Sequence, residues 1–84
     1  MIITKNQHDS GGIRNGYWEE YFSNGQIQCK GNYINGNRDG YWEWYHDNGK
    51  LRFKGNYLNG KPDGYWEWYF YNGQLEESIF YDRN

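Results

Sequence analysis

Several features that would direct this chain to a membrane, to export or to a disulfide framework are missing from its sequence. It has no alanine or valine, and only one cysteine, one proline and one methionine among 84 residues. The lone Cys29 cannot form an intramolecular disulfide, which is compatible with the reducing cytoplasm that we take as the expected location. The apolar runs are too short for a spanning helix, and residues 1–5 lack the apolar segment of a secretion signal.

Concentrated positive charge is also absent. The 9 Lys and Arg residues are spread along the chain and the net charge is −2, whereas nucleic-acid binding requires clustered basic side chains that neutralise phosphates. We therefore expect no direct nucleic-acid partner, and the lack of a basic amphipathic helix argues against contact with a membrane surface. The sequence has no zinc-ligand spacing and no phosphate-binding GxxxxGK[ST] loop, so we expect no metal and no cofactor.

Aromatic residues and glycine are what the sequence has in abundance. Aromatic residues make up 23% of the chain, which also contains 12 glycines. Disordered chains are poor in aromatics, and glycine with almost no proline is typical of tight turns between short strands. The composition therefore favours a folded chain of short β-strands.

A strict 24-residue repeat runs through the sequence. The motif Gly-Tyr-Trp-Glu begins at Gly16, Gly40 and Gly64, and the same interval separates Tyr33, Tyr57 and Tyr81. We divide the single domain of residues 1–84 into a degenerate half-repeat (1–15), two full repeats (16–39 and 40–63) and a third repeat with a C-terminal cap (64–84). In that cap Ile79 and Phe80 replace Gly55 and Asn56, a departure expected of the last repeat in a stack.

Each repeat predicts a β-hairpin, because Asn-Gly between two runs of alternating polarity is the strongest short hairpin signal. We place a two-residue type I′ turn at Asn48-Gly49, and a longer, looser turn at residues 35–40 and 59–64. Counting outward from Asn48-Gly49 pairs His46 with Leu51, Trp44 with Phe53 and Trp42 with Gly55 on one face, and Tyr45 with Arg52, Glu43 with Lys54 and Tyr41 with Asn56 on the other.

The same register makes specific predictions about side-chain contacts. We expect the Trp42 ring to lie over Gly55, and Tyr45 to form a cation–π pair with Arg52. In the first repeat the register sets Trp18 over Gly31, Phe22 on Ile27 and Glu19 on Lys30, and in the third it leaves Glu67 opposite Ser78 with no charged partner. The predicted fold is all-β: a single-layer antiparallel meander of stacked hairpins with about seven strands and no helix.

These residues resemble the variant class of MORN repeats, in which Gly-x-Trp-x-x-Tyr is followed by Asn-Gly, a leucine, Gly-x-Tyr and a second Asn-Gly. Residues 40–63 match this pattern throughout, at Gly40, Trp42, Tyr45, Asn48-Gly49, Leu51, Gly55, Tyr57 and Asn59-Gly60. The resemblance implies an elongated, curved sheet used as a scaffold, a protein-binding groove or a dimerisation element. It also implies an antitoxin-like role, as in some bacterial members, and lipid contact has been proposed for MORN proteins generally.

The candidate residues fall into a structural set and a binding set. The structural set is expected to form the core of the curved sheet and consists of Trp18, Trp42, Trp66, Gly31, Gly55, Leu51 and Leu75. The binding set joins an aromatic cluster towards the C-terminus to the Tyr-Glu-Tyr stripes, and consists of Trp44, Phe53, Trp68, Phe70, Tyr71, Tyr41, Glu43, Tyr65 and Glu67. A single sheet has no second layer, so a large apolar face left open would mark an interaction site.

The sequence predicts a protein–protein interaction module that is not an enzyme. Its glutamates recur one hairpin apart on an open surface, whereas acid–base catalysis needs groups that converge in one pocket. The expected partner is a protein of unknown identity, bound and neutralised by an antitoxin-like or inhibitory mechanism, and the open edge strands or the apolar face also allow a homodimer. Two alternatives stay open: a scaffold that associates with membrane lipid, and a repeat that stacks its aromatic ladder on carbohydrate or cell wall.

Overall fold

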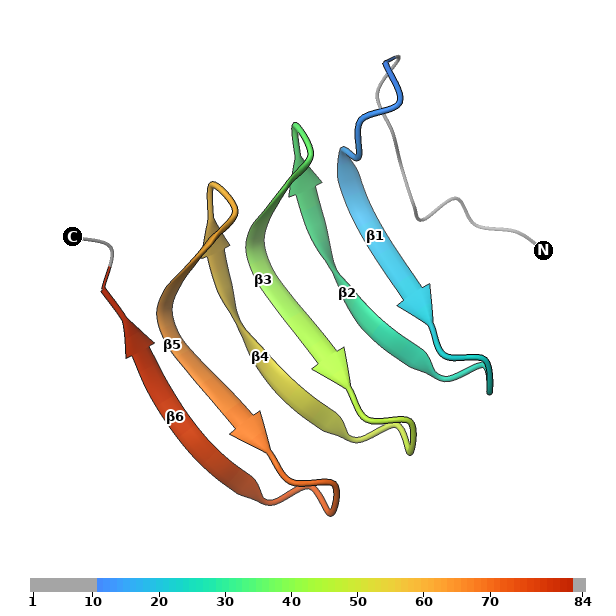
Figure 1. Cartoon of the computed structure of the whole chain (residues 1–84), viewed down its shortest axis with the longest axis vertical. Coiled ribbons are helices and arrows are strands. Elements are labelled where there is room, and N and C mark those ends of the chain that lie inside the picture. Colours follow the sequence, from blue (N-terminus) through green and yellow to red (C-terminus); the bar gives the residue numbers. More distant parts are fainter. Residues whose placement is uncertain (1–10, 83–84) are drawn as a thin grey trace.

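The computed structural model describes residues 11–82, which form one open sheet of six antiparallel strands in the order of the chain (Figure 1). The strands are β1 (Gly16–Tyr21), β2 (Ile27–Ile34), β3 (Asn37–Tyr45), β4 (Leu51–Leu58), β5 (Lys61–Tyr69) and β6 (Leu75–Tyr81). The predicted all-β meander without helices is confirmed for these residues. We expected about seven strands, and the strand expected from the half-repeat falls mostly on residues 1–10, outside the described residues.

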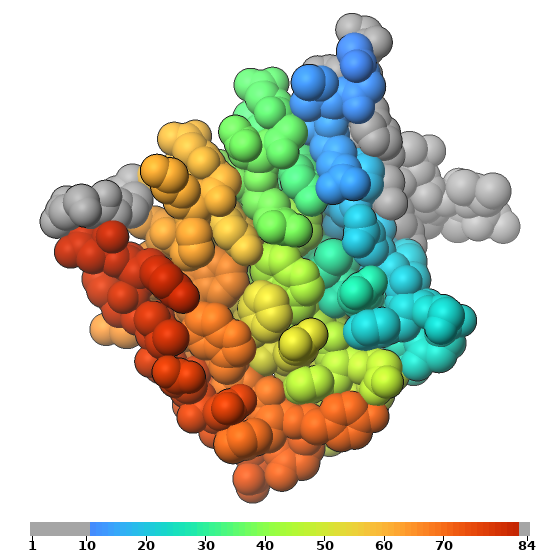
Figure 2. Space-filling view, viewed as in Figure 1, coloured from blue at the N-terminus to red at the C-terminus, as the bar shows by residue number. Residues whose placement is uncertain are grey.

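The molecule is a thin, bowed plate. Its Cα atoms span 40 × 39 × 15 Å, so the thickness is that of one sheet with its side chains. All strands bend along their length (Figure 1), and a space-filling view shows the strands side by side in sequence order across one broad face (Figure 2). Because no second layer covers either face of residues 11–82, the core must be built from large side chains that cover one another within the sheet.

The backbone register inside each hairpin is confirmed along most of its length. In the second repeat Trp44 pairs with Phe53, Glu43 with Lys54, Trp42 with Gly55 and Tyr41 with Asn56, as the sequence predicted. Near the turn the prediction was wrong: Tyr45 pairs with Leu51 instead of Arg52, because a β-bulge interrupts the ladder there. An equivalent bulge in the first repeat makes Tyr21 the partner of Ile27, so the predicted pairing of Phe22 with Ile27 was wrong as well.

The two kinds of turn are the reverse of those predicted. At Asn48-Gly49 the His46 N–H donates to the Lys50 carbonyl and the Gly49 N–H to the His46 carbonyl, and only Gly49 has a positive φ, of 88°. This is a three-residue loop in which a type I turn is followed by a left-handed glycine. The tight type I′ turns lie instead at Asn35-Gly36 and Asn59-Gly60, where both residues have positive φ.

Successive repeats meet along what we call the seams, the pairings of β2 with β3 and of β4 with β5. In the first seam Asn32 pairs with Asp39 and Lys30 with Glu43, so Gly31 lies opposite the three residues 40–42. Gly40 adopts a φ of 75° at this irregularity, and Gly64 adopts 76° at the equivalent place in the second seam. A left-handed φ is accessible to glycine without steric strain, so in β3 and β5 the Gly-Tyr-Trp-Glu motif begins with the residue at which the pairing becomes irregular.

Candidate functional site

The Trp face, which carries Trp18, Trp42, Trp44, Trp66 and Trp68, contains the core. Trp42 is completely buried, and its ring lies against Gly31, where an added Cβ would come within 2.1 Å of ring atom Cδ2. Its Nε1 donates to the Asn32 carbonyl oxygen at 2.9 Å. The Trp66 ring lies against Gly55 in the same way and its Nε1 donates to the Asn56 carbonyl oxygen. Each of these tryptophans therefore anchors its repeat to the preceding one.

This packing corrects the predicted ring contacts. We expected Trp42 over Gly55 and Trp18 over Gly31, on the partner strand of the same hairpin. The backbone pairings are right, but the ring that lies on each glycine comes from the next repeat, across the seam. The bend at the repeated glycine carries each tryptophan towards the preceding hairpin, and the sequence periodicity alone could not indicate that direction.

Two tyrosines complete the core and were missed as structural residues. Tyr33 is only 5% exposed and packs edge-on between Trp18 and Trp42, with ring centroids 5.4 and 5.1 Å apart. Tyr57 packs edge-on to Trp42 and Trp66 at 6.4 and 5.0 Å. The signal was available, because each tyrosine lies two residues after a core glycine and so points to the same face of its strand.

Arginine side chains cover part of this aromatic core, and sequence reasoning missed them too. The Arg38 guanidinium lies 5.3 Å from the ring centroids of both Trp42 and Trp44, within the range of cation–π attraction. Arg14 lies 4.4 Å above Trp18 in the same position of the preceding repeat. Pro62 takes this position 24 residues after Arg38, so no arginine stands at the equivalent place beside the next pair of tryptophans.

A row of stacked rings continues from this cover towards β5, with Arg38 over its first member and Arg52 over its second. Trp44 stacks on Phe53 with centroids 4.6 Å apart and an interplanar angle of 19°, and Phe53 stacks on Trp68 at 5.9 Å and 24°. All three side chains are half-buried. We call Trp44, Phe53 and Trp68 the aromatic row. The structure thus brings together three of the predicted binding residues on three adjacent strands.

The remaining predicted aromatic residues lie at the ends of strands. Phe70 and Tyr71 are exposed in the β5–β6 turn, 49% and 57%, and the Tyr71 hydroxyl donates to Asp47 of the β3–β4 turn at 2.8 Å. This hydrogen bond raises the pKa of Tyr71. Leu51 is half-buried, whereas Leu75 is 52% exposed and contributes less to the core than the sequence indicated.

The opposite side of the sheet, the Tyr-Glu face, carries the three Tyr-Glu-Tyr stripes. Glu43 accepts hydrogen bonds from the Tyr41 and Tyr45 hydroxyls and forms an ion pair with Lys30, Nζ to Oε1, at 3.6 Å. Burial opposes the ionisation of Glu43, but the tyrosine hydrogen bonds and Lys30 outweigh it and lower the pKa of the carboxyl. Burial and then the bond to Glu43 raise the pKa of both tyrosines.

Charge on this face alternates from strand to strand. The backbone register places Glu19, Lys30, Glu43, Lys54, Glu67 and Ser78 in one transverse row across all six strands. Glu67 forms an ion pair with Lys54 at 3.5 Å, so the prediction that it has no charged partner was wrong. The predicted contact of Tyr45 with Arg52 was also wrong, because Lys30 approaches the Tyr45 ring and Arg52 lies over Phe53.

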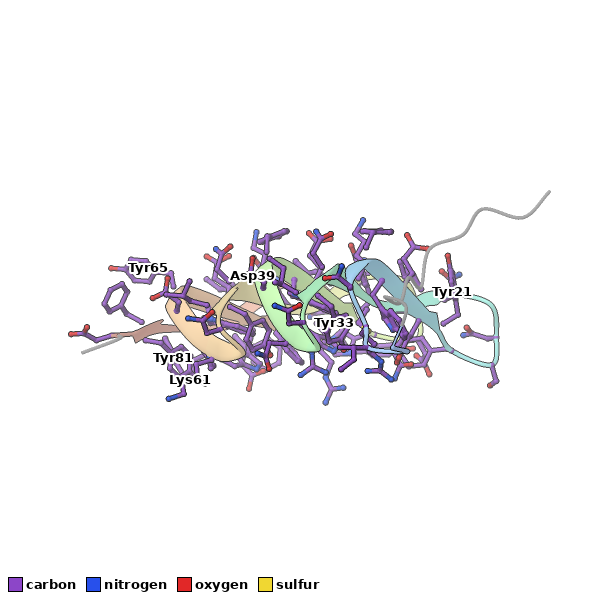
Figure 3. The ribbon with its side chains drawn as sticks, turned by 90° about the horizontal axis from the view of Figure 1, so that it is seen from above. Tyr21, Tyr33, Asp39, Lys61, Tyr65 and Tyr81 are labelled. Atoms are coloured by element: carbon purple, nitrogen blue, oxygen red, sulfur yellow. The ribbon has the colours of Figure 1, made fainter. Side chains whose placement is uncertain are left out.

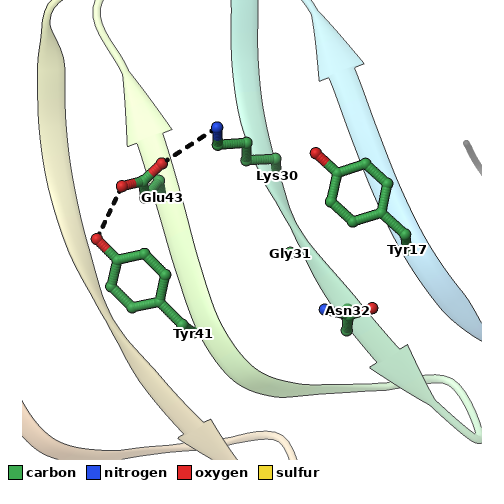
Figure 4. Close-up of a pocket in the computed structure, with 6 residues that line it drawn as sticks. All are labelled: Tyr17, Lys30, Gly31, Asn32, Tyr41 and Glu43. Atoms are coloured by element: carbon green, nitrogen blue, oxygen red, sulfur yellow. Dashed lines mark hydrogen bonds and ion pairs between the residues drawn. The ribbon is translucent and has the colours of Figure 1, made fainter.

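A shallow groove crosses the Tyr-Glu face between β1 and β3 (Figure 4). It has a volume of about 470 Å³, with Gly31 at its floor, Tyr17 and Tyr41 at its sides, and Lys30 and Glu43 at one end. Both charged groups there are already paired with each other. Figure 3 shows the plate edge-on, with side chains projecting from both faces and Tyr65 and Tyr81 on opposite sides near the β6 edge.

Among the described residues, groups capable of metal binding or nucleophilic chemistry do not converge. His46 Nε2 lies 3.1 Å from the Tyr69 carbonyl oxygen, and its ring packs against Tyr71. Cys29 is buried beneath the Trp face, and burial followed by the charge of Glu20 raises the pKa of its thiol. No cluster of three or more His, Cys, Asp or Glu side chains suited to a metal ion occurs within residues 11–82. Nor does that part of the chain contain a helix with the length and apolarity to cross a membrane.

Stacked hairpins with two extended, differently decorated faces define a repeat-type binding module. The model of the MORN repeat variant matches residues 14–35, 38–59 and 62–83, and the chain belongs to this family. Its repeats are in general non-enzymatic modules. Comparison with curated proteins and with solved structures returns no match.

Proposed function

We propose that this chain is a non-enzymatic module that binds a partner protein through the aromatic row on its Trp face. The observation that carries the proposal is the stacking of Trp44, Phe53 and Trp68 into one half-buried aromatic surface on a sheet that has no second layer over residues 11–82. Tryptophan is strongly enriched among the residues that dominate interface energies. Rings already held against each other also lose little freedom when a partner covers them.

The position of the row favours the C-terminal half of the module. Arg38 lies above Trp44 and Arg52 above Phe53, whereas Pro62 takes the place of Arg38 24 residues further along the chain. Phe70 and Tyr71 are exposed in the turn that follows Trp68. A partner that lies along the row would therefore contact β3, β4 and β5 and the turn before β6.

We further propose that binding neutralises the partner, as an antitoxin or an inhibitor does. A rigid aromatic row can cover a complementary surface without rearranging its own backbone, which suits a dedicated partner bound in equal amount. We expect the free partner to have an activity that falls when this chain is added. Membrane lipid and carbohydrate are the competing ligands, and vesicle flotation and polysaccharide pull-down distinguish them from a protein partner.

The experiment compares partner capture from lysate of the source cells by three forms of the chain. Trp68→Ala removes the end of the aromatic row, and Tyr65→Ala is the matched control because Tyr65 is 71% exposed on the opposite face. We expect the wild type and Tyr65→Ala to retain one protein in an amount nearly equal to that of the chain itself, and we expect Trp68→Ala to lose it. Retention by Trp68→Ala together with loss in Tyr65→Ala would assign binding to the Tyr-Glu face, and equal retention by all three would reject the aromatic row.

A further inference from the structure

The last strand departs from the interior strands at three consecutive positions. β2 and β4 both contain Lys-Gly-Asn, at residues 30–32 and 54–56, whereas β6 contains Ser78-Ile79-Phe80. All three departures lie within a segment that otherwise matches the family repeat. In β2 and β4 these positions form the seam to the next repeat, so the seam contacts show what the departures change.

The glycine of an interior strand is the docking position for the next repeat. A Cβ on Gly31 would lie 2.1–2.4 Å from three atoms of the Trp42 ring, and a Cβ on Gly55 would lie 2.1–2.5 Å from three atoms of Trp66. Real Cβ contacts are essentially never shorter than 3.0 Å. A branched side chain at this position therefore excludes the incoming ring, and Ile79 places such a side chain in β6.

The lysine and the asparagine of the interior strand are also replaced. Lys30 and Lys54 form ion pairs with the glutamate of the next repeat, at 3.6 and 3.5 Å. Ser78 is uncharged, so it cannot form this ion pair with the glutamate of a further repeat. At the third position the Phe80 ring packs against Tyr65, with centroids 4.8 Å apart, and is 58% exposed.

We propose that Ser78, Ile79 and Phe80 determine the specificity of the β6 edge by rejecting a further MORN strand, including β1 of a second copy of this chain. β1 carries Trp18 and Glu19 at the positions that would meet Ile79 and Ser78. An open edge strand normally invites pairing with another chain. Here the backbone groups of β6 accept only a strand that brings no tryptophan to the position facing Ile79, and Ser78 gives an incoming glutamate no ion pair. This inference concerns the edge and does not depend on binding at the aromatic row.

The test appends one extra repeat to the chain. A copy of residues 59–82 is placed directly after Asp82, in one protein behind the natural β6 and in another behind β6 with Ser78→Lys, Ile79→Gly and Phe80→Asn. Repeat stability is the sum of the repeat and its interface with its neighbour, so an appended repeat folds only where the seam forms. Hydrogen exchange of the appended strands measures this directly.

We expect the appended strands behind the natural β6 to exchange at the rate of an unfolded chain, and those behind the triple substitution to be protected as β5 is. The triple variant without the extra repeat is the control for folding, and Ile79→Gly alone tests whether removing the branched side chain restores part of the protection. Protection behind the natural β6 would overturn the proposal. Lack of protection behind a folded triple variant would overturn it equally.

Discussion

Replacing Gly31 by alanine is the most direct test of how the repeats are joined. The new Cβ would start 2.1 Å from the Trp42 ring, so the ring or the strand must move by about 1.3 Å to reach ordinary contact at 3.4 Å. Trp42 has little room to move, because it is fully buried, stacks on Trp44 and donates a hydrogen bond to the Asn32 carbonyl oxygen. The added methyl group therefore strains the tightest contact in the core.

The expected loss follows from two limiting cases. Overpacking with adjustment costs about 1–3 kcal/mol, and complete displacement of a buried tryptophan costs about 3–5 kcal/mol. We expect Gly31→Ala to lower the free energy of unfolding by about 3 kcal/mol. This is a large part of the roughly 4–13 kcal/mol available to a domain of this length. Urea unfolding followed by far-UV circular dichroism measures it.

A double-mutant cycle with Trp42→Ala isolates the contact. Trp42→Ala alone should cost about 3 kcal/mol or more, because it empties a fully buried site. Without the ring the clash is gone, and Gly31→Ala should then be neutral or stabilising by about 0.5–1 kcal/mol, since alanine suits a strand better than glycine. The reasoning is refuted if Gly31→Ala costs less than about 1 kcal/mol in the wild type, or costs the same in both backgrounds.

Three further predictions concern the Tyr-Glu face, the turns and the buried thiol. Tyr45→Phe removes a hydrogen bond that lowers the pKa of Glu43, so NMR titration should show that the pKa of Glu43 rises, and an unchanged titration would contradict the assignment. A lowered carboxyl pKa stabilises the fold above the pKa of the unfolded chain, and this stabilisation is lost as the pH falls through the pKa of the folded state. The stability of Tyr45→Phe should therefore fall less steeply with acid than that of the wild type. Asn59→Ala should cost about 1–2 kcal/mol in urea unfolding, because Asn59 has a φ of 52° in a type I′ turn; no loss would mean that this turn is not left-handed. Cys29 should react with a thiol reagent far more slowly in the native protein than in urea, because it is buried and its pKa is raised, and equal rates would show that the Trp face opens freely.

The sequence was sufficient to predict the sheet and most of the hairpin register. The 24-residue period and the alternation of polarity place Trp42 opposite Gly55 and Glu43 opposite Lys54, and the structure agrees. These features are predictable because each depends on residues within one hairpin, close together in the chain.

The turn types were not predictable from the Asn-Gly pairs alone, because each repeat contains two such pairs. At Asn48-Gly49 the asparagine side chain accepts a hydrogen bond from the Lys50 N–H at 2.9 Å, and only the glycine is left-handed. At Asn59-Gly60 both residues are left-handed. The same dipeptide thus serves two backbone geometries, and the bulge that accompanies the first one also shifted the predicted partner of Tyr45.

The seam contacts were beyond the reach of sequence reasoning for a different reason. Trp42 and Gly31 belong to different repeats, and the register between repeats shifts by two residues around Gly40. Nothing in the alternating pattern of either strand encodes that shift. The sequence pattern therefore indicated most of the large aromatic side chains of the Trp face, but not the glycines on which their rings lie, nor the packing of Tyr33, Tyr57 and the two arginines above them.

The docking of each tryptophan on the glycine of the preceding repeat gives the array a direction. At each seam the repeat on the C-terminal side contributes the tryptophan ring, and the repeat on the N-terminal side contributes the glycine that receives it. The two sides of a seam are therefore not interchangeable. A gene could gain or lose one full 24-residue unit from the interior and restore an intact ring-and-glycine contact at the new junction. Gain or loss of half a unit would bring two rings or two bare glycines together, so length variation in this chain is expected to occur in whole repeats.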